Sequence, residues 1–340
     1  MEFKVRNVNV AFEELFWAFK AMAQDGLQPE PSRNGPVLAL PEPVIITYER
    51  PWERVLFHHG RDANPVFHLM ESLWMLAGRR DVYFPALFNS RIGQYSDDGE
   101  KFNAAYGHRW RRHFGRDQLL EVIEMLRADP HTRQAVLQMW DADDLLKPTR
   151  DKACNMSVVF DRRGGALNMT VFNRSNDLWW GALGANAVHF SILQEFVALA
   201  LGTRIGVYRQ VSNNLHLYLE LYDAKRYLES PPRAELYDYY DTREADHQPL
   251  MRLGRDPREW LLECERFCAN PFDSGQRYKN EFFADVAHPV AMVGRTRRTR
   301  SGTGRRWAER IKAEDWRLAA QEWIDRREYQ KTREQARAID

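Results

Sequence analysis

The chain has 340 residues, of which 44% are hydrophobic, and this is enough to bury the core of one large domain or of two. Its net charge of +1 gives no overall attraction to nucleic acid or to a membrane surface. We find no apolar run near the roughly 20 residues that span a bilayer, and no signal-peptide core at the N-terminus. Three cysteines do not make a disulfide framework in a chain of this length. We therefore expect a soluble protein of the reducing cytoplasm.

The first part of the chain is predicted to form two helices with a broken strand between them. Apolar residues at helical spacing predict a helix over residues 9–24. A loop with three prolines follows and carries Arg33, for which a solvated side chain is the ordinary outcome. Residues 37–48 predict a strand that two prolines interrupt. Residues 65–78 predict an apolar helix with one acid, Glu71, which needs a partner or a function because burying a lone carboxylate is costly.

The middle of the chain is predicted to contain a long loop and several short regular elements. Residues 84–110 are expected to be loop-like, with Tyr106 near their end. Residues 119–126 predict a short amphipathic helix, and residues 133–140 alternate as a strand does. Residues 207–218 predict a further strand, whose simplest interpretation is cross-strand packing.

The central stretch, residues 151–190, carries the densest set of chemically active residue types. Cys154 precedes an apolar run, the pair Gly164-Gly165 predicts a tight turn, and a second run then leads to Arg174. Two strands joined by a tight turn place the start of the first beside the end of the second, so we expect Cys154 close to Arg174. A neighbouring guanidinium favours the thiolate, which is the nucleophilic form of cysteine. From Asn186 onward the pattern predicts a helix.

A lone cysteine is more often a small buried hydrophobe than a catalyst, and this alternative applies to Cys154. The Arg-Ser-Asn-Asp cluster that begins twenty residues later favours the catalytic interpretation. Cys264 and Cys268 lie four residues apart on one face of a predicted helix, and we interpret them as packing residues. A CxxxC pair without nearby histidine or further cysteine is a poor zinc signal, so we expect no metal site.

The last fifty residues differ in character from the rest. We predict a catalytic domain over residues 1–290, a basic linker over 291–306 and a C-terminal helical extension over 307–340. The extension is predicted to be one charged helix with three tryptophans. A basic run of this kind is usually solvated, so contact with nucleic acid is the less favoured interpretation.

A set of motifs spread over residues 10–220 shares its order and spacing with a known family. The motifs are Ser32-Arg33-Asn34-Gly35, Glu71, Tyr106-Gly107-His108-Arg109-Trp110, Arg133, Cys154, Arg174-Ser175-Asn176-Asp177, Gly181, Asn186 and His216-Leu217-Tyr218. Together they resemble the thymidylate synthase and deoxycytidylate hydroxymethylase family. The resemblance implies an α+β fold, with a large mixed β-sheet flanked by helices, and a homodimer with shared active sites.

The resemblance also implies a role for each residue. Cys154 would add to C6 of a pyrimidine deoxynucleoside monophosphate, so that C5 attacks a one-carbon unit from the co-substrate 5,10-methylenetetrahydrofolate. Arginines suit the 5′-phosphate because each offers a planar fork of donors. By resemblance, Arg33, Arg174, Ser175 and a second subunit's Arg133 would hold the phosphate, His216 and Tyr218 the sugar, Asn186 the base, and Asp177 and Gly181 the folate, while Glu71 and Tyr106 would organise proton transfers.

Several departures from the synthase pattern bear on the product. Gln134 stands where synthases have a second arginine, and Ala153 and Asn155 flank the cysteine in place of proline and histidine. Ile92 or a neighbour stands where a tryptophan shields the intermediate, and the apolar C-terminus that seals a synthase site is replaced. A site open to water would let water attack the exocyclic methylene, which favours a 5-hydroxymethyl product over a methyl product.

Three functions therefore stay open. The favoured one is 5-hydroxymethylation of dUMP, with dCMP as second choice. The others are a true thymidylate synthase and a non-catalytic relative that binds nucleotide or RNA through its basic tail. The amide of Asn186 suits uracil, because it can donate to O4 and accept from N3–H. One extra residue between Gly181 and Asn186 leaves open whether Ala185 faces the base instead.

Overall fold

The computed structural model describes residues 1–221, 224–233, 238–241, 250–251, 253, 256–296 and 303–337. Its strands are β1 (Glu2–Val5), β2 (Val37–Ala39), β3 (Val44–Tyr48), β4 (Val136–Gln138), β5 (Asn155–Arg163), β6 (Ala166–Asn173), β7 (Asn176–Asp177), β8 (Arg204–Ser212) and β9 (Leu215–Tyr218). A six-stranded mixed sheet has the order β1-β3-β8-β6-β5-β4, and a three-stranded sheet has the order β2-β9-β7. The α+β fold with a large mixed sheet is confirmed.

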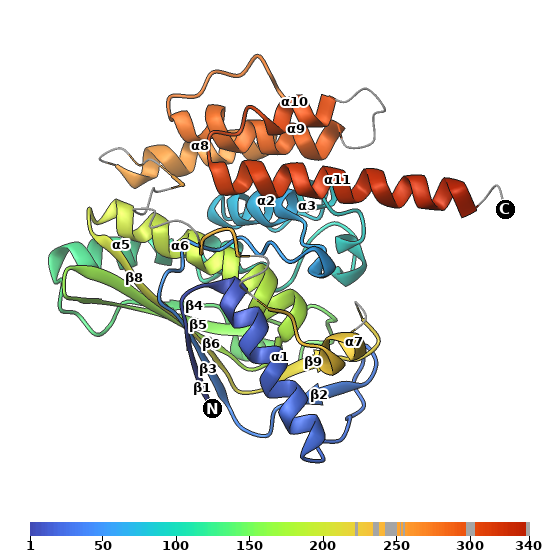
Figure 1. The fold of residues 1–340 in the computed structure, drawn as a ribbon. Helices are drawn as coiled ribbons and strands as arrows, with labels where there is room; N and C mark the ends of the chain where they lie inside the picture. The colour runs from blue at the N-terminus through green and yellow to red at the C-terminus, as the bar shows by residue number, and fades with distance from the viewer. Residues whose placement is uncertain are drawn as a thin grey trace.

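Helices stack in layers on one side of the large sheet. The α-helices are α1 (Val8–Gln24), α2 (Pro65–Leu76), α3 (Tyr83–Ala86), α4 (Tyr106–His108), α5 (Gln118–Ala128), α6 (Asn186–Ala200), α7 (Ala224–Glu229), α8 (Pro257–Ala269), α9 (His288–Thr296), α10 (Thr303–Ala308) and α11 (Glu314–Arg337). Helix α6 packs on β6 and β8, and α2 packs on α6. Helices α8, α9 and α11 all pack on α2, and with α10 they form the part of the molecule on the far side of α2 from the sheet (Figure 1).

The β5–β6 hairpin positions the centre of the candidate site. Gly164 and Gly165 form its two-residue loop with φ of +57° and +72°, as a turn of this type requires. The backbone N–H of Arg174 donates to the carbonyl of Cys154 at 2.9 Å. The predicted hairpin and the predicted proximity of Cys154 to Arg174 are both confirmed.

The two faces of this hairpin differ in burial. Residues that point toward α6, such as Val158 and Val171, are fully buried. Apolar residues on the opposite face, including Val159, Phe172 and Val211, are only partly buried. An antiparallel sheet with one solvated face usually carries polar residues there. The opposite face of this sheet is therefore more apolar than a solvated face needs to be.

The stretch Leu178–Ala200 corrects the expectation that no apolar run is long enough to span a membrane. By length and composition alone it could cross one, but 89% of its most apolar window is buried inside the protein. It comprises the π-helix η5 (Leu178–Ala185) and helix α6. A helix that is apolar on all sides suits the centre of a large core, and α6 lies between the sheet and α2.

Several elements differ in extent from their prediction. Residues 84–110 contain all or part of four short helical elements rather than a plain loop. The strand predicted over residues 133–140 is reduced to β4, and it follows a turn in which the N–H of Thr132 donates to the carbonyl of Asp129. The strand predicted over residues 207–218 is divided into β8 and β9. The backbone bends at residues 213–214 and passes from the large sheet to the small one.

The C-terminal region packs against the rest of the protein. Helix α11 lies against α2 and buries Trp316 and Trp323 completely, while residues 309–313 separate it from α10. The single helix predicted here is therefore two. Helices α9 and α10 also reach into both ends of the segment predicted to be a linker, and residues 297–302 lie outside the described residues.

Candidate active site

The side chains around Cys154 are those of Arg174, which directly follows β6, and of Tyr106, which begins α4. The Nη2 atom of Arg174 lies 3.7 Å from the Sγ atom of Cys154, and its Nε donates to the carbonyl of Ala153 at 2.8 Å. The hydroxyl oxygen of Tyr106 accepts hydrogen bonds from the backbone N–H groups of Cys154 (3.2 Å) and Asn155 (3.3 Å). Arg174 and Tyr106 thus fix the thiol and its backbone from two sides.

The charge state of Cys154 differs from the simple expectation that an arginine makes it a thiolate. Burial raises the pKa of the Cys154 thiol above its usual value, although the charges of Arg174 and, more weakly, Arg33 act in the opposite direction. The thiol form is therefore favoured at neutral pH. The sequence shows a neighbouring guanidinium, but it does not show how deeply the sulfur is buried.

Asn186 lies in the site next to Asn155, the residue that follows the cysteine. Its Oδ1 accepts a hydrogen bond from Nδ2 of Asn155 at 3.1 Å. The extra residue between Gly181 and Asn186 is taken up in the π-helix η5, which kinks at Gly184 (φ −129°, ψ −109°). A π-helical bulge accommodates one added residue without shifting the helix that follows. Asn186, rather than Ala185, is thus the residue that contacts the cysteine's neighbour.

Asp177 and His216 lie side by side where β7 pairs with β9. Oδ2 of Asp177 accepts a short hydrogen bond from the N–H of Trp180, whereas its Oδ1 is buried without a partner among the described residues. Burial raises the pKa of Asp177 to about 6 and lowers the pKa of His216. At neutral pH the carboxylate is mostly charged and the imidazole is neutral. Tyr218 follows with its ring 5.2 Å from that of His216.

Glu71 lies on α2 against His189 of α6, with 3.2 Å between Oε2 and Nε2. Burial raises the pKa of Glu71 to about 8 and lowers the pKa of His189 to about 3. Both groups are therefore mostly neutral at pH 7, and their contact is not an ion pair. The sequence predicted that the buried Glu71 needs a partner or a function. His189 is the side chain it contacts, and Glu71 also keeps its proton at pH 7.

The shifted pKa of Glu71 predicts how stability depends on pH. A glutamate in an unfolded chain titrates near 4.5, so the folded state binds this proton more tightly. Its stabilising contribution is full below that pH and is lost as the pH rises through about 8. We expect the unfolding free energy of the wild type to fall by roughly 4 kcal/mol more than that of Glu71→Gln between pH 5 and pH 9.

Urea denaturation of both proteins at the two pH values measures this difference. Glu124→Gln, a change at an exposed position on α5, is the control and should follow the wild type. Equal pH dependence of Glu71→Gln and the wild type would show that Glu71 titrates normally.

The two remaining phosphate candidates lie in different surroundings. Arg33 is exposed and its Nη1 donates to the carbonyl of Arg150 at 3.2 Å, on the same side as Cys154. Arg133 is also exposed but precedes the edge strand β4. Val136 of that strand pairs with Val159, five residues and hence about 17 Å along β5 from the cysteine. The structure does not bring Arg133 to the cysteine of its own chain.

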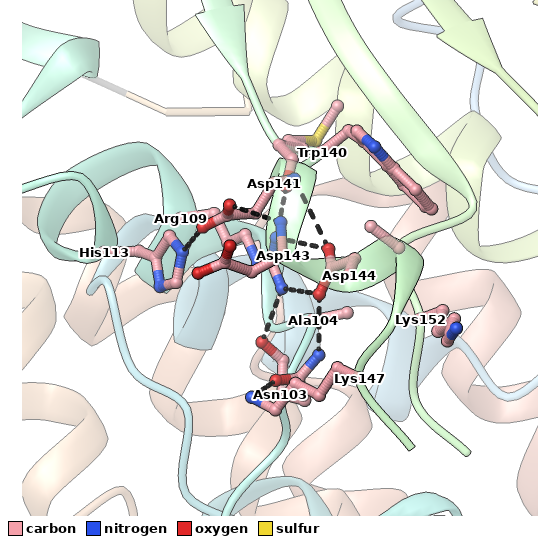
Figure 2. Close-up of polar contacts among 12 residues, drawn as sticks. Asn103, Ala104, Arg109, His113, Trp140, Asp141, Asp143, Asp144, Lys147 and Lys152 are labelled. Carbon is pink, nitrogen blue, oxygen red and sulfur yellow. Dashed lines mark hydrogen bonds and ion pairs between the residues drawn. The ribbon is translucent and has the colours of Figure 1, made fainter. Parts of the chain in front are cut away.

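A buried ion pair between Arg109 and Asp144 holds together two segments that flank the site, and sequence reasoning did not predict it. Arg109 donates to both carboxylate oxygens of Asp144 at 2.7 and 2.9 Å, and to the carbonyls of Met139 and Asn103 (Figure 2). These bonds tie the segment after Tyr106 to the segment that leads to Cys154. Arg109 is part of the family-like motif, but nothing in the sequence marks Asp144 as its partner among neighbouring acids. Ser175 and Gly181 complete the predicted set, and both are partly buried.

A small pocket lies elsewhere, between α2 and α11. His68, Trp316 and Arg326 are among its lining residues, and none of the predicted site residues lines it. Among the described residues no group of three or more histidine, cysteine or acidic side chains is arranged to hold a metal ion.

Comparisons with known proteins agree with this geometry. Residues 64–253 match the family model described as thymidylate synthase. The chain is 44% identical, over 351 aligned positions, to a deoxyuridylate hydroxymethyltransferase of Pseudomonas phage M6, which covers 99% of this chain and 97% of that protein. It is 45% identical over 257 positions to the protein of the same name from Bacillus phage SP01, covering 72% of this chain and 64% of that one. The thymidylate synthase of T4 phage shares the fold, with a TM-score of 0.51 and 20% identity over 63% of this chain and 81% of that one.

Proposed function

Since this chain belongs to the thymidylate synthase family, we propose that it is a one-carbon transferase that hydroxymethylates C5 of dUMP. The observation that carries the proposal is the similarity to a deoxyuridylate hydroxymethyltransferase over nearly the whole length of both chains. The grouping around Cys154 supports it. The site combines a nucleophile, the cation Arg174 beside it, and the amide of Asn186, which can form hydrogen bonds to a base.

The first chemical step uses Cys154. Its thiolate forms a bond to C6 of the pyrimidine, and the electron pair of the C5–C6 double bond moves toward C5 and O4. Arg174 is placed to stabilise the thiolate, because its Nη2 lies 3.7 Å from Sγ. Tyr106 holds the backbone on which the sulfur is mounted. The burial that raises the thiol pKa also excludes water that would compete for the cysteine's partners.

The one-carbon unit would come from 5,10-methylenetetrahydrofolate, which supplies an activated methylene when bound. The buried Oδ1 of Asp177, which has no partner among the described residues, fits a ligand that presents N–H donors, as a pterin does. Gly181 would lie beside this ligand in the proposed arrangement. We therefore assign Asp177 and Gly181 to folate binding.

The nucleotide then completes the reaction. C5 would bond to the methylene carbon, and loss of the C5 proton would then break the carbon–nitrogen bond to tetrahydrofolate and leave an exocyclic methylene. A water molecule would add its oxygen to that carbon as the sulfur–C6 bond breaks. The net change consumes one water, releases tetrahydrofolate and involves no redox step. Glu71 holds a proton at pH 7 because its pKa is about 8, so it can serve proton transfer near O4 through an ordered water. Arg33, Arg174 and Ser175 would hold the phosphate, and His216 with Tyr218 the sugar.

We further propose that the active unit is a homodimer in the cytoplasm. The partly buried apolar face that includes Val159, Phe172 and Val211 suits packing against a second sheet. The distance of Arg133 from its own Cys154 supports a role in the site of the partner. The three cysteines, all unpaired, suit a reducing compartment.

The product distinguishes this proposal from thymidylate synthesis. With dUMP and methylenetetrahydrofolate we expect 5-hydroxymethyl-dUMP and tetrahydrofolate, and no rise in the absorbance that accompanies dihydrofolate formation. Mass spectrometry of the nucleotide checks the added group. Methylated nucleotide with an equal amount of dihydrofolate would make the protein a synthase, and turnover of dCMP with little of dUMP would overturn the choice of base.

A further inference from the structure

A row of four buried amides runs from the active site into the core, and we call it the amide row (Asn155, Asn186, Asn176 and Gln210). Nδ2 of Asn155 donates to Oδ1 of Asn186 at 3.1 Å. Nδ2 of Asn186 donates to Oδ1 of Asn176 at 3.0 Å. Nδ2 of Asn176 donates to Oε1 of Gln210 at 2.9 Å. Each side chain is at most 8% exposed, so these bonds are not exchanged freely for bonds to water.

The end of the row at Gln210 fixes its direction. Nε2 of Gln210 donates to the backbone carbonyl of Ala182 at 3.0 Å. A carbonyl only accepts hydrogen bonds, so the amide of Gln210 has one allowed orientation. The oxygen of Gln210 must then face Asn176. Asn176, Asn186 and Asn155 in turn each direct their NH2 group toward the oxygen of the amide nearer to Gln210. If Asn186 alone turned over, like groups would oppose each other at both of its contacts.

The other end of the row shows that its direction is imposed from the core. Oδ1 of Asn155 is buried without a partner among the described residues. In the reverse direction this oxygen would accept from Asn186, and Asn176 would accept from the hydroxyl of Ser212, to which it now donates at 3.0 Å. The three asparagines would thus be satisfied equally well or better in reverse. Among the hydrogen bonds of the described residues, only the one from Gln210 to the carbonyl of Ala182 opposes the reversal.

We propose that the amide row locks Asn186 in one orientation and thereby makes the site select uracil over cytosine. This inference rests on the proposed function. After its two bonds within the row, Asn186 retains one N–H and one oxygen lone pair for a base. Uracil presents a donor at N3 and an acceptor at O4, and cytosine presents the reverse. An asparagine that is free to turn over serves both patterns, whereas a locked one serves a single pattern.

Asn155, Asn176 and Gln210 are positioning residues in this account, because they act through Asn186. Close packing helps to hold them. A Cβ at Gly181 would lie 2.3 Å from Oδ1 of Asn176, so glycine leaves the room that the row requires. The pairing of β5 with β6 shifts register between Asn155 and Ser157. This shift lets Asn155 point to the face that carries Asn186, instead of the face that regular alternation would give it.

The test is the ratio of equilibrium affinities for dUMP and dCMP, measured by calorimetric titration of the intact protein without folate. Gln210→Met removes the contact with Ala182 at similar volume. We expect the preference for dUMP to fall about tenfold or more, with dCMP bound more tightly than by the wild type. A purely structural defect would weaken both nucleotides alike. Gln194→Met is the matched control, because Gln194 is an equally buried amide that donates to the carbonyls of Leu167 and Val207 outside the row.

Asn176→Ala cuts the row at a second point and provides the same readout if Gln210→Met does not fold. An unchanged ratio in either folded variant overturns the lock, and a reduced ratio in the Gln194 control does so as well. Because the ratio is a binding measurement, it does not depend on the product. A product other than 5-hydroxymethyl-dUMP would overturn the proposed function and leave this test intact.

Discussion

Replacing Cys154 with alanine is expected to lower kcat by about four orders of magnitude or more, since loss of a catalytic nucleophile has effects of this size in other enzymes. The proposed reaction depends on a covalent bond between Sγ and C6, and the other two cysteines lie on α8. Binding of dUMP should survive within a few fold, because the phosphate is assigned to arginines and Ser175 and the sugar to His216 and Tyr218. Rapid-quench kinetics and calorimetric titration measure the two effects separately.

The matched control for this experiment is Cys268→Ala, since Cys268 is a buried cysteine on α8. It should lose some stability and keep its rate. A Cys154→Ala protein with a near-normal rate would remove the thiol from the mechanism and revive the non-catalytic interpretation. Loss of dUMP binding together with the rate would instead show that the substitution distorts the site.

The part of the site that the sequence predicts is the part that local geometry determines. A Gly-Gly loop of two residues brings the ends of its strands together wherever it occurs, so the contact between Cys154 and Arg174 follows from the hairpin alone. Long periodic segments such as α1 and α2 were predictable for a similar reason, because their apolar spacing is strong.

The part that the sequence does not predict depends on partners that are distant along the chain. Arg109 and Asp144 are separated by 35 positions, and the amide row joins residues from β5, α6, β7 and β8. Asparagines and glutamines occur throughout the chain, so composition does not identify four that form one row. The pKa values of Cys154 and Glu71 likewise depend on burial, which only the fold supplies.

The basic C-terminal segment shows a different limit. Its charge pattern suggested a solvated appendage, yet α11 buries two tryptophans against α2 and places Arg326 and Arg327 on Asp62 at 3.2 and 2.8 Å. Long charged side chains lie along the outer side of a helix whose inner side is apolar, so high charge does not exclude packing. The tryptophans, rather than the arginines, were the informative residues.

Replacing Arg133 with alanine is expected to lower kcat/KM by about a hundredfold, since a charge-assisted bond to phosphate contributes about 1.5–3 kcal/mol. The position of Arg133 makes this loss of activity a test of whether two subunits share an active site. Arg133 precedes β4 at the far end of its pairing with β5, so it cannot reach the cysteine of its own chain. If it acts at all, it acts in the site of a second subunit. Arg116→Ala, at an exposed arginine that pairs with Glu121, is the control and should keep its activity.

Mixing the Cys154→Ala and Arg133→Ala proteins then gives the decisive measurement. In a mixed dimer, the site with an intact Cys154 receives the intact Arg133 from the other subunit, while the second site lacks both groups. Half of the dimers in an equal, fully exchanged mixture are mixed, and each carries one working site, so activity should recover to about a quarter of the wild-type value. Differently tagged subunits show that exchange has occurred. Exchange without any recovery would mean that Arg133 does not serve a shared site, and the phosphate would then depend on Arg33, Arg174 and Ser175 of one chain.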